Sequence, residues 1–584
     1  MNDYILYINK GGEWQIVDLG NNKPAMNYQT NDIADLKSRQ YDYSQALKIP
    51  MTKRNCLLFG GVDNIDVSTS FPYIKHECRL FSNGFVIAGV GSYLILDKVT
   101  DSFECQIVSG ASTLYDALNA PMLEVDLGSI IRNKAACNPV NFTPEYKYAA
   151  ATFIKGGAPI FQSGLADIFP FIHLKSAVEN MLSSHGYTLQ TNLTSADLEK
   201  KYISLASITS DFPLYKAKAS FEGIAAGGDF PYNITINPSG KLNNFSNQLS
   251  YFVTAFYCSV RIKVVIESTE IATCYIASII GGVSTQLYYK SSLNHNIDIS
   301  ITLGLNDNVN FYASAPSGSV VSSTVEFSIV PANVPYGEIL PFANNLGFEK
   351  QIDFFKAFLQ LFGLSAVVDS ENNIVEAYNM KLLYENKIIA KDWSKKLHIK
   401  QTEDSFSIGS YAKKNYIKFL DNTDDNVTDK AFFEIQNDLL SDEKEVISFP
   451  FQAGMDDYVS GNLVANIPLE EITDTDINFK GCPPHLVELS DDTISFLVDG
   501  TLFNYQRAVH VRSQELLDNY YSELKTMLSS ARVKEAYFNL SDSDIEKFEP
   551  NIPIYINAYG HYFYVNKIIN YVSGQLTKCQ IIKL

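Results

Sequence analysis

The sequence predicts a protein that is mainly β, with some α+β character, and that contains several domains. Its 584 residues exceed what one core normally holds, and 46% of them are hydrophobic, as in ordinary soluble globular chains. Tyrosine (35) and phenylalanine (36) are more frequent than helical bundles need. Most apolar runs are short, alternate with polar residues and end at Gly, Asn, Asp or Ser, which is typical of strands and turns.

The first 150 residues contain a series of predicted strands. Alternating or β-branched runs cover residues 4–8, 14–19, 77–81, 85–88, 93–98 and 103–108. The sequence Ser82-Asn83-Gly84 favours a tight hairpin, because Asn and Gly accept positive φ angles. At the other end of the chain, alternating isoleucines and a Gly-containing turn predict a β-meander over residues 552–584.

Three segments have the three-to-four spacing of apolar residues that predicts an amphipathic helix. These segments and their predicted caps are 170–184 with Gly186, 350–361 with Gly363, and 513–529 with Ser513. The second helix has a broad apolar face, so we expect it to lie between two layers. Trp393, one of two tryptophans, is expected to anchor the segment that follows this helix in the core.

Residues 205–335 differ in composition from the rest of the chain. They are low in charge and rich in Ser, Thr, Asn and Gly, and they contain runs of period two that predict a separate β-sandwich inserted into the parent fold. Several prolines near residues 331–341 predict a rigid linker at its exit. Four tyrosines could form a recognition face, or could pack in the core as paired aromatics usually do. They are Tyr251, Tyr257, Tyr288 and Tyr289.

The charge of the chain is strongly negative and local. The formal net charge is −19, which argues against a general binder of nucleic acid or anionic membranes. Residues 421–492 hold 18 acidic residues against three lysines, a net charge of −15. The eight cysteines are scattered without a CxxC pair, which favours reduced thiols in a cytosol-like compartment. We expect neither a secretory signal nor a membrane-spanning segment.

Catalytic motifs are missing where the chemistry would need them. His76-Glu77 lacks the second histidine of a zinc-binding HExxH helix, and we find no phosphate-binding loop and no GxSxG serine elbow. The run 421–426 lacks the glycine and terminal glutamate of a calcium loop. We therefore expect no enzyme, no metal and no cofactor. Paired carboxylates of the glycosidase kind stay open, because their separation is spatial rather than sequential.

Three stretches, in this order and spacing, resemble one family. Residues 42–55 are similar to a recurrent element Ser-x-x-hydrophobic-x-Ile-Pro-x-Thr-x-x-Asn, here running from Ser44 to Asn55. The second stretch runs from 354–364 to Asp392-Trp393-Ser394, and the third joins 532–540 with 559–568. Together they resemble the tail-hub (baseplate hub) proteins of tailed bacteriophages and prophages, in the version carried by phages of Bacteroidetes. The resemblance leaves out the inserted sandwich.

The resemblance implies a structural protein that closes the distal end of a phage tail tube as a homotrimeric ring and guides genome passage. It implies two tail-tube-like β-barrel domains in each subunit, braced by helices. Its implied partners are the tube, distal tail and tip or spike proteins, with transient passage of DNA, and its implied location is the virion tail, assembled in the host cytoplasm. The expected segments are 1–150 (first barrel), 151–204 (helical brace), 205–335 (inserted sandwich), 336–364 (linker and helix) and 365–584 (second barrel, with the acidic segment 421–492).

Two further groups of residues acquire possible roles from this resemblance. Ile49-Pro50 predicts an extended approach to a projecting polar loop, which is either an assembly contact or an ordinary connection. The loop residues are Thr52, Lys53, Arg54 and Asn55. Carboxylates that face the lumen would keep DNA from sticking, whereas a solvated outer face is the alternative. The acidic candidates are Asp424, Asp425, Asp456 and Asp457.

Two other functions compete with assembly. The inserted sandwich could bind a receptor or a host-surface glycan, and the chain could be a tail enzyme that degrades cell wall. We favour assembly because no catalytic constellation is visible in the sequence.

Overall fold

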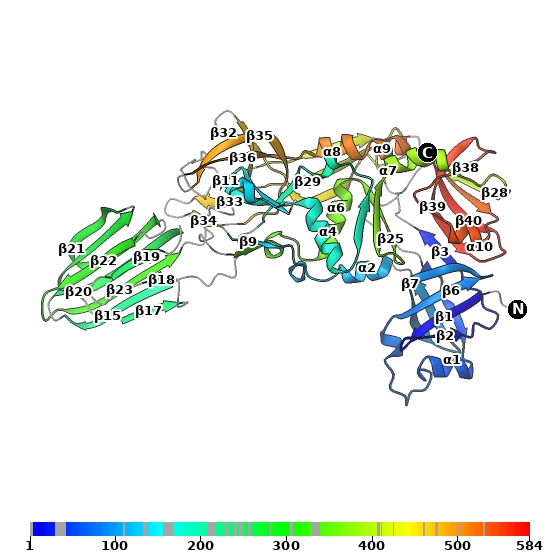
Figure 1. Ribbon diagram of the computed structural model, residues 1–584, viewed down its shortest axis with the longest axis horizontal. Coiled ribbons are helices and arrows are strands. Elements are labelled where there is room, and N and C mark those ends of the chain that lie inside the picture. Colours follow the sequence, from blue (N-terminus) through cyan, green and yellow to red (C-terminus); the bar gives the residue numbers. More distant parts are fainter. Residues whose placement is uncertain are drawn as a thin grey trace.

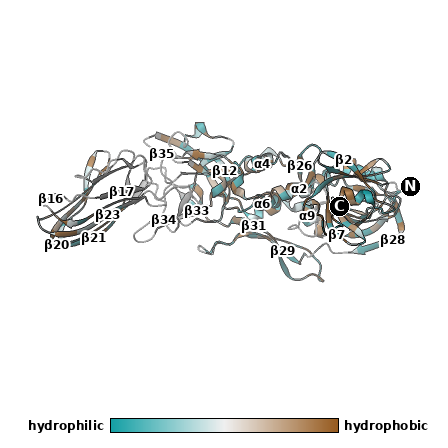
Figure 2. Cartoon of the chain, turned by 90° about the horizontal axis from the view of Figure 1, so that it is seen from below, coloured by the Kyte–Doolittle hydropathy of each residue, from teal (hydrophilic) through white to brown (hydrophobic). Residues whose placement is uncertain are grey.

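The structure is a computed structural model in which most of the chain is described. The described ranges are 4–29, 43–108, 111–131, 138–143, 145–155, 168–206, 216–225, 228–229, 233–237, 242–243, 250–254, 258–280, 282–303, 308–329, 339–405, 409, 411–423, 426–459, 462–472, 477–479, 481–498, 501–529 and 532–584. The molecule is elongated, with the strands of the insert at one end and both termini at the other (Figures 1 and 2).

One 14-stranded sheet joins the two ends of the chain. Its main path runs β2-β1-β6-β7-β8-β4-β3-β39-β40-β37-β28, so that β3 pairs with β39 across almost the full sequence. Its strands are β1 (Tyr4–Lys10), β2 (Glu13–Val17), β3 (Met26–Gln29), β4 (Tyr43–Ser44), β5 (Leu47–Pro50), β6 (His76–Ser82), β7 (Phe85–Val99), β8 (Ser102–Val108), β27 (Lys391–Asp392), β28 (Leu397–Ser405), β37 (Val533–Phe538), β38 (Ile554–Ile556), β39 (His561–Tyr571) and β40 (Thr577–Lys583).

The local predictions for these strands are confirmed. Asn83 and Gly84 have φ angles of 50° and 85°, so the predicted hairpin between β6 and β7 is formed. The segments 85–88 and 93–98, predicted as two strands, are parts of the single strand β7. The predicted C-terminal meander is present as β38, β39 and β40.

The domain boundaries expected from the sequence do not follow the cores of the structure. Strands β1 to β8 share one hydrophobic core with β37 to β40, although the sequence analysis placed the latter in a separate domain 365–584. Trp393 is 3% exposed and packs against Phe538 with ring centroids 5.4 Å apart, which confirms the expected anchor. The apolar face of the meander is covered by the first strands of the chain, a long-range pairing that no local pattern encodes.

A closed barrel forms the second unit, again from distant segments. Its strands in order are β10 (Tyr146–Ala150), β12 (Ile168–His173), β14 (Lys201–Ser204), β35 (Leu486–Val498) and β36 (Thr501–His510). The helix predicted over 170–184 begins only at Leu174, because residues up to His173 pair on both sides as β12. Gly186 follows its end with a φ of 80°, as predicted for a helix C-cap.

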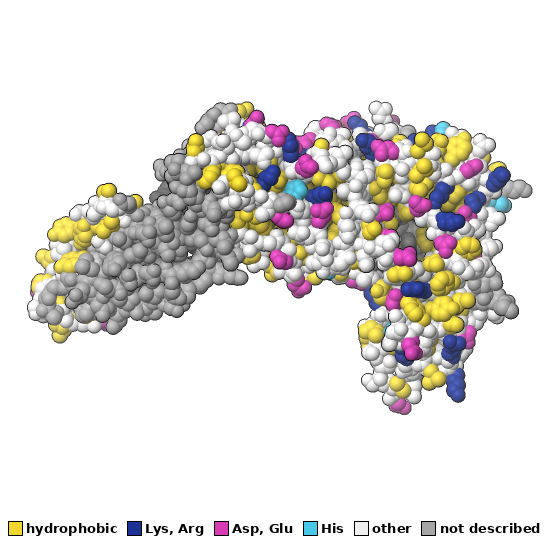
Figure 3. Space-filling model, viewed as in Figure 1, with side chains coloured by type: hydrophobic (Ala, Val, Ile, Leu, Met, Phe, Trp, Pro, Cys, Tyr) yellow, Lys and Arg dark blue, Asp and Glu magenta, His cyan; other side chains and the backbone are white. Residues whose placement is uncertain are grey.

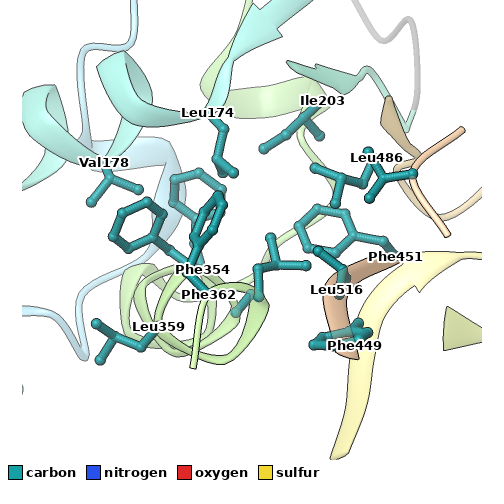
Figure 4. Close-up of a cluster of buried hydrophobic side chains, with 14 of the residues drawn as sticks. Leu174, Val178, Ile203, Phe354, Leu359, Phe362, Phe449, Phe451, Leu486 and Leu516 are labelled. Carbon is teal, nitrogen blue, oxygen red and sulfur yellow. The ribbon is translucent and has the colours of Figure 1, made fainter. Parts of the chain in front are cut away.

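Four helices share one large hydrophobic core with the barrel. They are α4 (Leu174–Ser184), α6 (Gln351–Leu361), α8 (Ser513–Tyr520) and α9 (Ser522–Ser529). Apolar side chains of α4, α6 and α8 meet those of β14, β31 (Glu443–Gln452) and β35 in one cluster (Figure 4). Helix α6 contacts α4 on one side and β31 on another, so the expected position between two layers is confirmed.

The single helix predicted over 513–529 is wrong in one respect. The chain forms two helices, because Tyr521 leaves helical geometry with φ −121°. Its ring is buried, and its hydroxyl donates a hydrogen bond to the carbonyl of Gln360 at the end of α6. This tertiary contact interrupts an amphipathic pattern that would otherwise continue.

The remaining elements form small sheets and short helices. The strands are β9 (Ser129–Ile131) with β24 (Ile339–Pro341); β13 (Thr188–Thr191) with β25 (Leu364–Asp369) and β26 (Ile374–Asn379); β29 (Lys414–Leu420) and β30 (Lys430–Glu434) with β31; and β11 (Thr152–Lys155) with β32 (Asp456–Val459), β33 (Asn462–Ile472) and β34 (Ile477–Phe479). The short helices are α1 (Lys53–Leu58), α2 (Ala111–Ala117), α5 (Ser195–Leu198), α7 (Met380–Glu385) and α10 (Asp542–Glu546), with 3-10 turns η1 (Phe71–Tyr73), η2 (Met122–Glu124), η3 (Pro139–Asn141), η5 (Ala343–Asn345) and η6 (Asn386–Ile389). The acidic segment 421–492 is thereby spread over several sheets.

The insert has a core of its own, formed by residues between Ala225 and Val325. Its strands are β15 (Lys216–Ile224), β16 (Gly228–Asp229), β17 (Asn233–Asn237), β18 (Leu242–Asn243), β19 (Ser250–Thr254), β20 (Cys258–Ile280), β21 (Val283–Leu303), β22 (Asn308–Ala315) and β23 (Val320–Ile329). The long strand β20 pairs with β23 through its first half and with β22 through its second. Side chains from both halves of β20 belong to the core of the insert. Strand β20 therefore connects the layers of the expected sandwich.

Helix α6 ends at a glycine whose replacement should be costly. Gly363 has a φ of 58°, and a Cβ atom there would lie 2.8 Å from the carbonyl oxygen of Tyr520. We expect Gly363→Ala to lower the free energy of unfolding by about 2–4 kcal/mol, because backbone strain and a backbone clash add. Gly574→Ala is the control: φ is 76° but the Cβ meets nothing within 4 Å, so a loss of only about 1–2 kcal/mol is expected in urea unfolding. Equal losses at both positions would contradict the clash.

No helix in the described ranges combines the length and apolar character needed to span a membrane.

Candidate functional site

The expected assembly loop is the start of a helix. Thr52 caps α1, because its hydroxyl accepts a hydrogen bond from the backbone N–H of Asn55 at 3.3 Å. The prediction of a projecting loop is therefore wrong, since Thr52 is a preferred N-cap residue and begins a helix directly after the extended Ile49-Pro50. Lys53 and Arg54 are exposed on this helix, and an assembly contact at them remains a prediction.

Asn55 faces the interior and connects three segments. It is 0% exposed, and its side chain accepts from the N–H of Asp18 at 3.0 Å and donates to the carbonyls of Asp18 and Pro50 at 2.8 Å each. The side chain is thus fully used within the subunit and is not available to a partner. Its role is to fix α1 against the end of β2.

Asn55→Ala should lower the free energy of unfolding by about 2–3 kcal/mol, because three partly buried backbone groups lose their hydrogen bonds. Lys53→Ala on the exposed side of the same helix should change it by no more than about 0.5 kcal/mol. Urea unfolding of the two variants measures the difference, and a similar value for both would refute the clamp.

The four acidic candidates have different surroundings. Asp424 and Asp425 lie outside the described residues. Asp457 is half-buried and accepts a hydrogen bond from the amide of Asn466 at 2.6 Å. The side chain of Asp456 is only 7% exposed and is engaged inside the subunit, so the prediction that it presents charge to a lumen is wrong.

Asp456 begins a buried chain of hydrogen bonds, which we call the histidine relay. Its Oδ1 is 2.8 Å from Nδ1 of His510, and Nε2 of His510 is 2.9 Å from Nδ1 of His485. Since the carboxylate can only accept, Nδ1 of His510 carries a proton; in the neutral ring Nε2 then accepts from Nδ1–H of His485. A protonated His510 would instead donate from Nε2 to Nδ1 of His485. In both states Nε2 of His485 is buried and has no hydrogen-bond partner among the described residues.

The histidine relay ties several elements together. Arg512, just before α8, forms an ion pair with Asp456 and donates to the carbonyl of Gly454 at 2.7 Å. Asp429 accepts from the N–H of Ser513 at 3.1 Å, at the start of the same helix. A Cβ at Gly454 would lie 2.1 Å from Nε2 of His510, so only glycine fits beside the ring. Strand β32, the barrel and α8 are joined at this point.

Burial lowers the pKa of His485 well below its ordinary value, and the neighbouring His510 adds to this effect. For Asp456, burial alone would raise the pKa, but the hydrogen bond and charge of His510 and the charge of Arg512 bring it below its usual value. Both shifts favour a neutral His485 and an ionised Asp456 in the folded chain. Because all three relay side chains are buried, we assign the relay a structural role.

No group of three or more His, Cys, Asp or Glu side chains suited to a metal ion occurs in the described part of the chain.

The predicted recognition tyrosines separate into different positions. Tyr257 lies outside the described residues, and the backbone of Tyr251 pairs with Asn310 of β22. Tyr288 packs against the core of the insert, and its hydroxyl lies 3.2 Å from Nδ1 of His295, so its place in an outer face is wrong. Tyr289 is 60% exposed and points to the opposite side.

The sequence analysis missed two tyrosines that accompany Tyr289. Tyr275 of β20 lies directly opposite Tyr289 of β21, and Tyr312 of β22 lies opposite Tyr275. The rings of Tyr275 and Tyr289 are 6.3 Å apart. Only the strand register shows this grouping, because the three residues are not adjacent in the sequence.

The N-terminal part of the large sheet has an apolar outer face. Ile5, Trp14 and Ile16 are 43%, 38% and 39% exposed on the β1–β2 hairpin. The guanidinium carbon of Arg79 lies 4.5 Å from the ring centroid of Trp14. Figure 3 shows hydrophobic side chains gathered on this lobe. Among the described residues β2 pairs only with β1 and β28 only with β37, so the sheet has two unpaired edges.

The stretches that carry the family resemblance converge in space. Leu47 and Ile49 of the first stretch, Trp393 of the second and Phe538 and Val565 of the third belong to one hydrophobic core. These residues are far apart in sequence, yet they build the same sheet and its interior. Residues 354–364 of the second stretch belong instead to the other large core.

Comparisons with known proteins give distant likenesses. No family model matches the chain, and no curated protein matches it. Among solved structures, the chain is similar to the 43 kDa tail protein of prophage MuSo2 from Shewanella oneidensis, with 7% identity, coverage of 99% of this chain and 98% of the other, and a TM-score of 0.34. Murine APRIL is similar over 20% of this chain and 99% of its own, with 8% identity and a TM-score of 0.16. The stem and receptor-binding domain of spike protein P1 from bacteriophage PM2 is similar over 22% of this chain and 92% of its own, with 8% identity and a TM-score of 0.09. At these TM-scores none of the likenesses decides the function.

Proposed function

We propose that this chain is a structural protein of a phage or prophage tail, acting as a hub that closes the end of the tail tube as a ring of subunits. The observation that carries the proposal is that the first and third resembling stretches, together with Trp393 of the second, meet in one core and one sheet.

The free edges of the large sheet support association between subunits. An exposed edge strand is a template for pairing, and soluble proteins normally cover such edges. The edge strand β2 also carries the exposed side chains Trp14 and Ile16. Closed ring symmetry would cover these edges and this apolar face in every copy.

In this proposal the closed barrel and the 14-stranded sheet are the two tube-like units of a trimer, with α4 and α6 as braces. Tube, distal tail and tip or spike proteins are its neighbours, DNA passes through the centre, and the ring is assembled in the host cytoplasm before it enters the virion. The acidic candidates that remain for the lumen are Asp424, Asp425 and Asp457.

Native mass spectrometry of the purified full chain tests the ring, and electron microscopy of particles labelled with antibody to the chain tests its place. We expect an oligomer with trimer mass and label at one end of the tail. A chain that stays monomeric at every concentration and leaves the particles unlabelled would overturn the proposal.

Substitutions at the apolar face sharpen this test. The double change Trp14→Glu with Ile16→Glu places charge on the β2 edge and should reduce the oligomer fraction at least tenfold. Ile388→Glu is the control, because Ile388 is 92% exposed on η6, away from this strand. Circular dichroism checks that both variants remain folded. Equal oligomer fractions for the two variants would show that the β2 edge is not part of the interface between subunits.

A further inference from the structure

The outer face of β20, β21 and β22 presents three tyrosines in a line, which we call the tyrosine row. Tyr312, Tyr275 and Tyr289 occupy directly opposite positions on the three adjacent strands. Directly opposite residues in an antiparallel sheet point to the same face. Their sequence neighbours Cys274 and Phe311 are buried in the core of the insert, so the tyrosines point outward.

The positions around the tyrosine row are polar and uncharged. On one side lie Ser314, Thr273 and Ser291, again directly opposite one another, with Oγ1 of Thr273 and Oγ of Ser291 2.9 Å apart. On the other side Asn310 of β22 and Gln286 of β21 both lie opposite Ala277 of β20. These positions hold hydroxyls and amides but no charged side chain.

This composition selects the chemistry of a ligand. Tyrosine rings offer flat apolar surface at low cost in side-chain entropy, and their hydroxyls donate and accept hydrogen bonds. The hydroxyls and amides beside the rings can form hydrogen bonds with hydroxyls and amides of a ligand. A phosphate, an acidic polymer or a basic peptide would find no counter-ion among these positions.

We infer that the tyrosine row is a binding surface for a neutral oligosaccharide, whose ring faces stack on the tyrosines and whose hydroxyls bond to the flanking serines, threonine and amides. With strands about 4.8 Å apart, the three tyrosines span about 10 Å, enough for a short oligosaccharide laid across the strands. The inference is independent of the proposed hub role, since it concerns only the insert.

The test uses the full chain and a panel of neutral hexasaccharides of glucose, xylose and N-acetylglucosamine, with a sialylated oligosaccharide for comparison. Titration calorimetry should detect binding of at least one neutral probe. Tyr275→Ala and Tyr289→Ala should each weaken it at least tenfold, whereas Tyr275→Phe, which keeps the ring, should weaken it less than threefold.

Tyr458→Ala is the matched control, because Tyr458 is also highly exposed (76%) but lies on β32, outside the insert. It should bind the probe like the unchanged chain. The inference is overturned if no neutral probe binds, if only the sialylated probe binds, or if both alanine variants bind normally. Capture of a host-surface protein through the same tyrosines, without any glycan binding, would also overturn it. None of these outcomes affects the oligomer test of the hub proposal.

Discussion

Replacing Asp542 with alanine is expected to lower the free energy of unfolding by about 3–5 kcal/mol, because a buried carboxylate is removed from all of its donors. The residue is 6% exposed at the start of α10. Its carboxylate accepts from the hydroxyl of Tyr571, from Asn83 at 2.8 Å, from Ser573 at 2.9 Å and from Ser82 at 3.2 Å. It thus joins the β6–β7 hairpin to the last hairpin of the chain.

The protonation state of Asp542 fits this role. Burial alone would raise the pKa of its carboxyl, but the hydrogen bonds from Tyr571, Asn83, Ser573 and Ser82 outweigh burial and hold the pKa below its usual value. The folded-state pKa lies below the unfolded one. The contribution of Asp542 is therefore present above about pH 4 and is lost only as the pH falls further.

Glu546→Ala on the same helix is the control for Asp542→Ala. Its carboxylate is exposed and accepts a single hydrogen bond from the N–H of Val86 at 3.1 Å, so a loss of at most about 1 kcal/mol is expected. Chemical unfolding at pH 7, followed by circular dichroism, compares the two. If Asp542→Ala were no worse than the control, the carboxylate would not be the link between the two ends of the chain.

Asp456→Ala is expected to have an effect of similar size, about 3–5 kcal/mol, because it leaves Arg512 and His510 without their buried partner. Asp457→Ala, at the neighbouring position, should cost about 1 kcal/mol or more, since Asp457 is half-buried and accepts from Asn466. The same unfolding measurement separates them. Comparable losses would argue that the histidine relay does not stabilise the joint between β32, the barrel and α8.

The histidine relay also predicts how stability changes with pH. The pKa of His485 in the folded chain lies well below that of an unfolded histidine, so the folded chain binds fewer protons below about pH 6.5. Stability should therefore fall as the pH falls from 6.5 towards 5, by up to about 1.4 kcal/mol per pH unit for this imidazole. Asp456 does not contribute in this range, because its pKa is lowered from a value already near 4.

His485→Leu isolates this effect, because leucine cannot take up a proton. Between pH 6.5 and 5, the slope of the unfolding free energy against pH should be smaller in this variant by up to about 1.4 kcal/mol per pH unit, the value for one proton. His76 and His173 also have lowered pKa values through burial, so part of the slope should remain. An unchanged slope in His485→Leu would show that the relay histidine already binds its proton in the folded chain.

Local patterns carried much of the secondary structure. The Asn83-Gly84 turn, the end of α4 before Gly186 and the end of α6 before Gly363 depend on backbone conformations that these residues accept more readily than most, so the sequence marks them directly. The broad apolar face of α6 likewise required burial on more than one side. Trp393 was predictable as an anchor because so large an apolar ring is costly to expose.

The errors arose where a tertiary contact outweighed a local pattern. Residues 170–173 were predicted as the start of the helix, but pairing with β10 and β14 makes them part of a strand. The stripe of apolar residues over 513–529 is interrupted because Tyr521 packs into the core. Asp456 belongs to an acidic segment and looked like surface charge, yet His510 and Arg512, more than fifty residues later, surround it.

By itself the sequence determined that this protein is mainly β, where several strands and turns of its two ends lie, and that residues near 205–335 differ from the rest. Only the tertiary structure decided that the first and last strands share one sheet, that Asn55 and Asp456 are internal, and that Tyr275, Tyr289 and Tyr312 form one row. The physical reason is range: turn chemistry and side-chain periodicity act between neighbours in sequence, whereas strand register and buried hydrogen bonds depend on which distant segments meet.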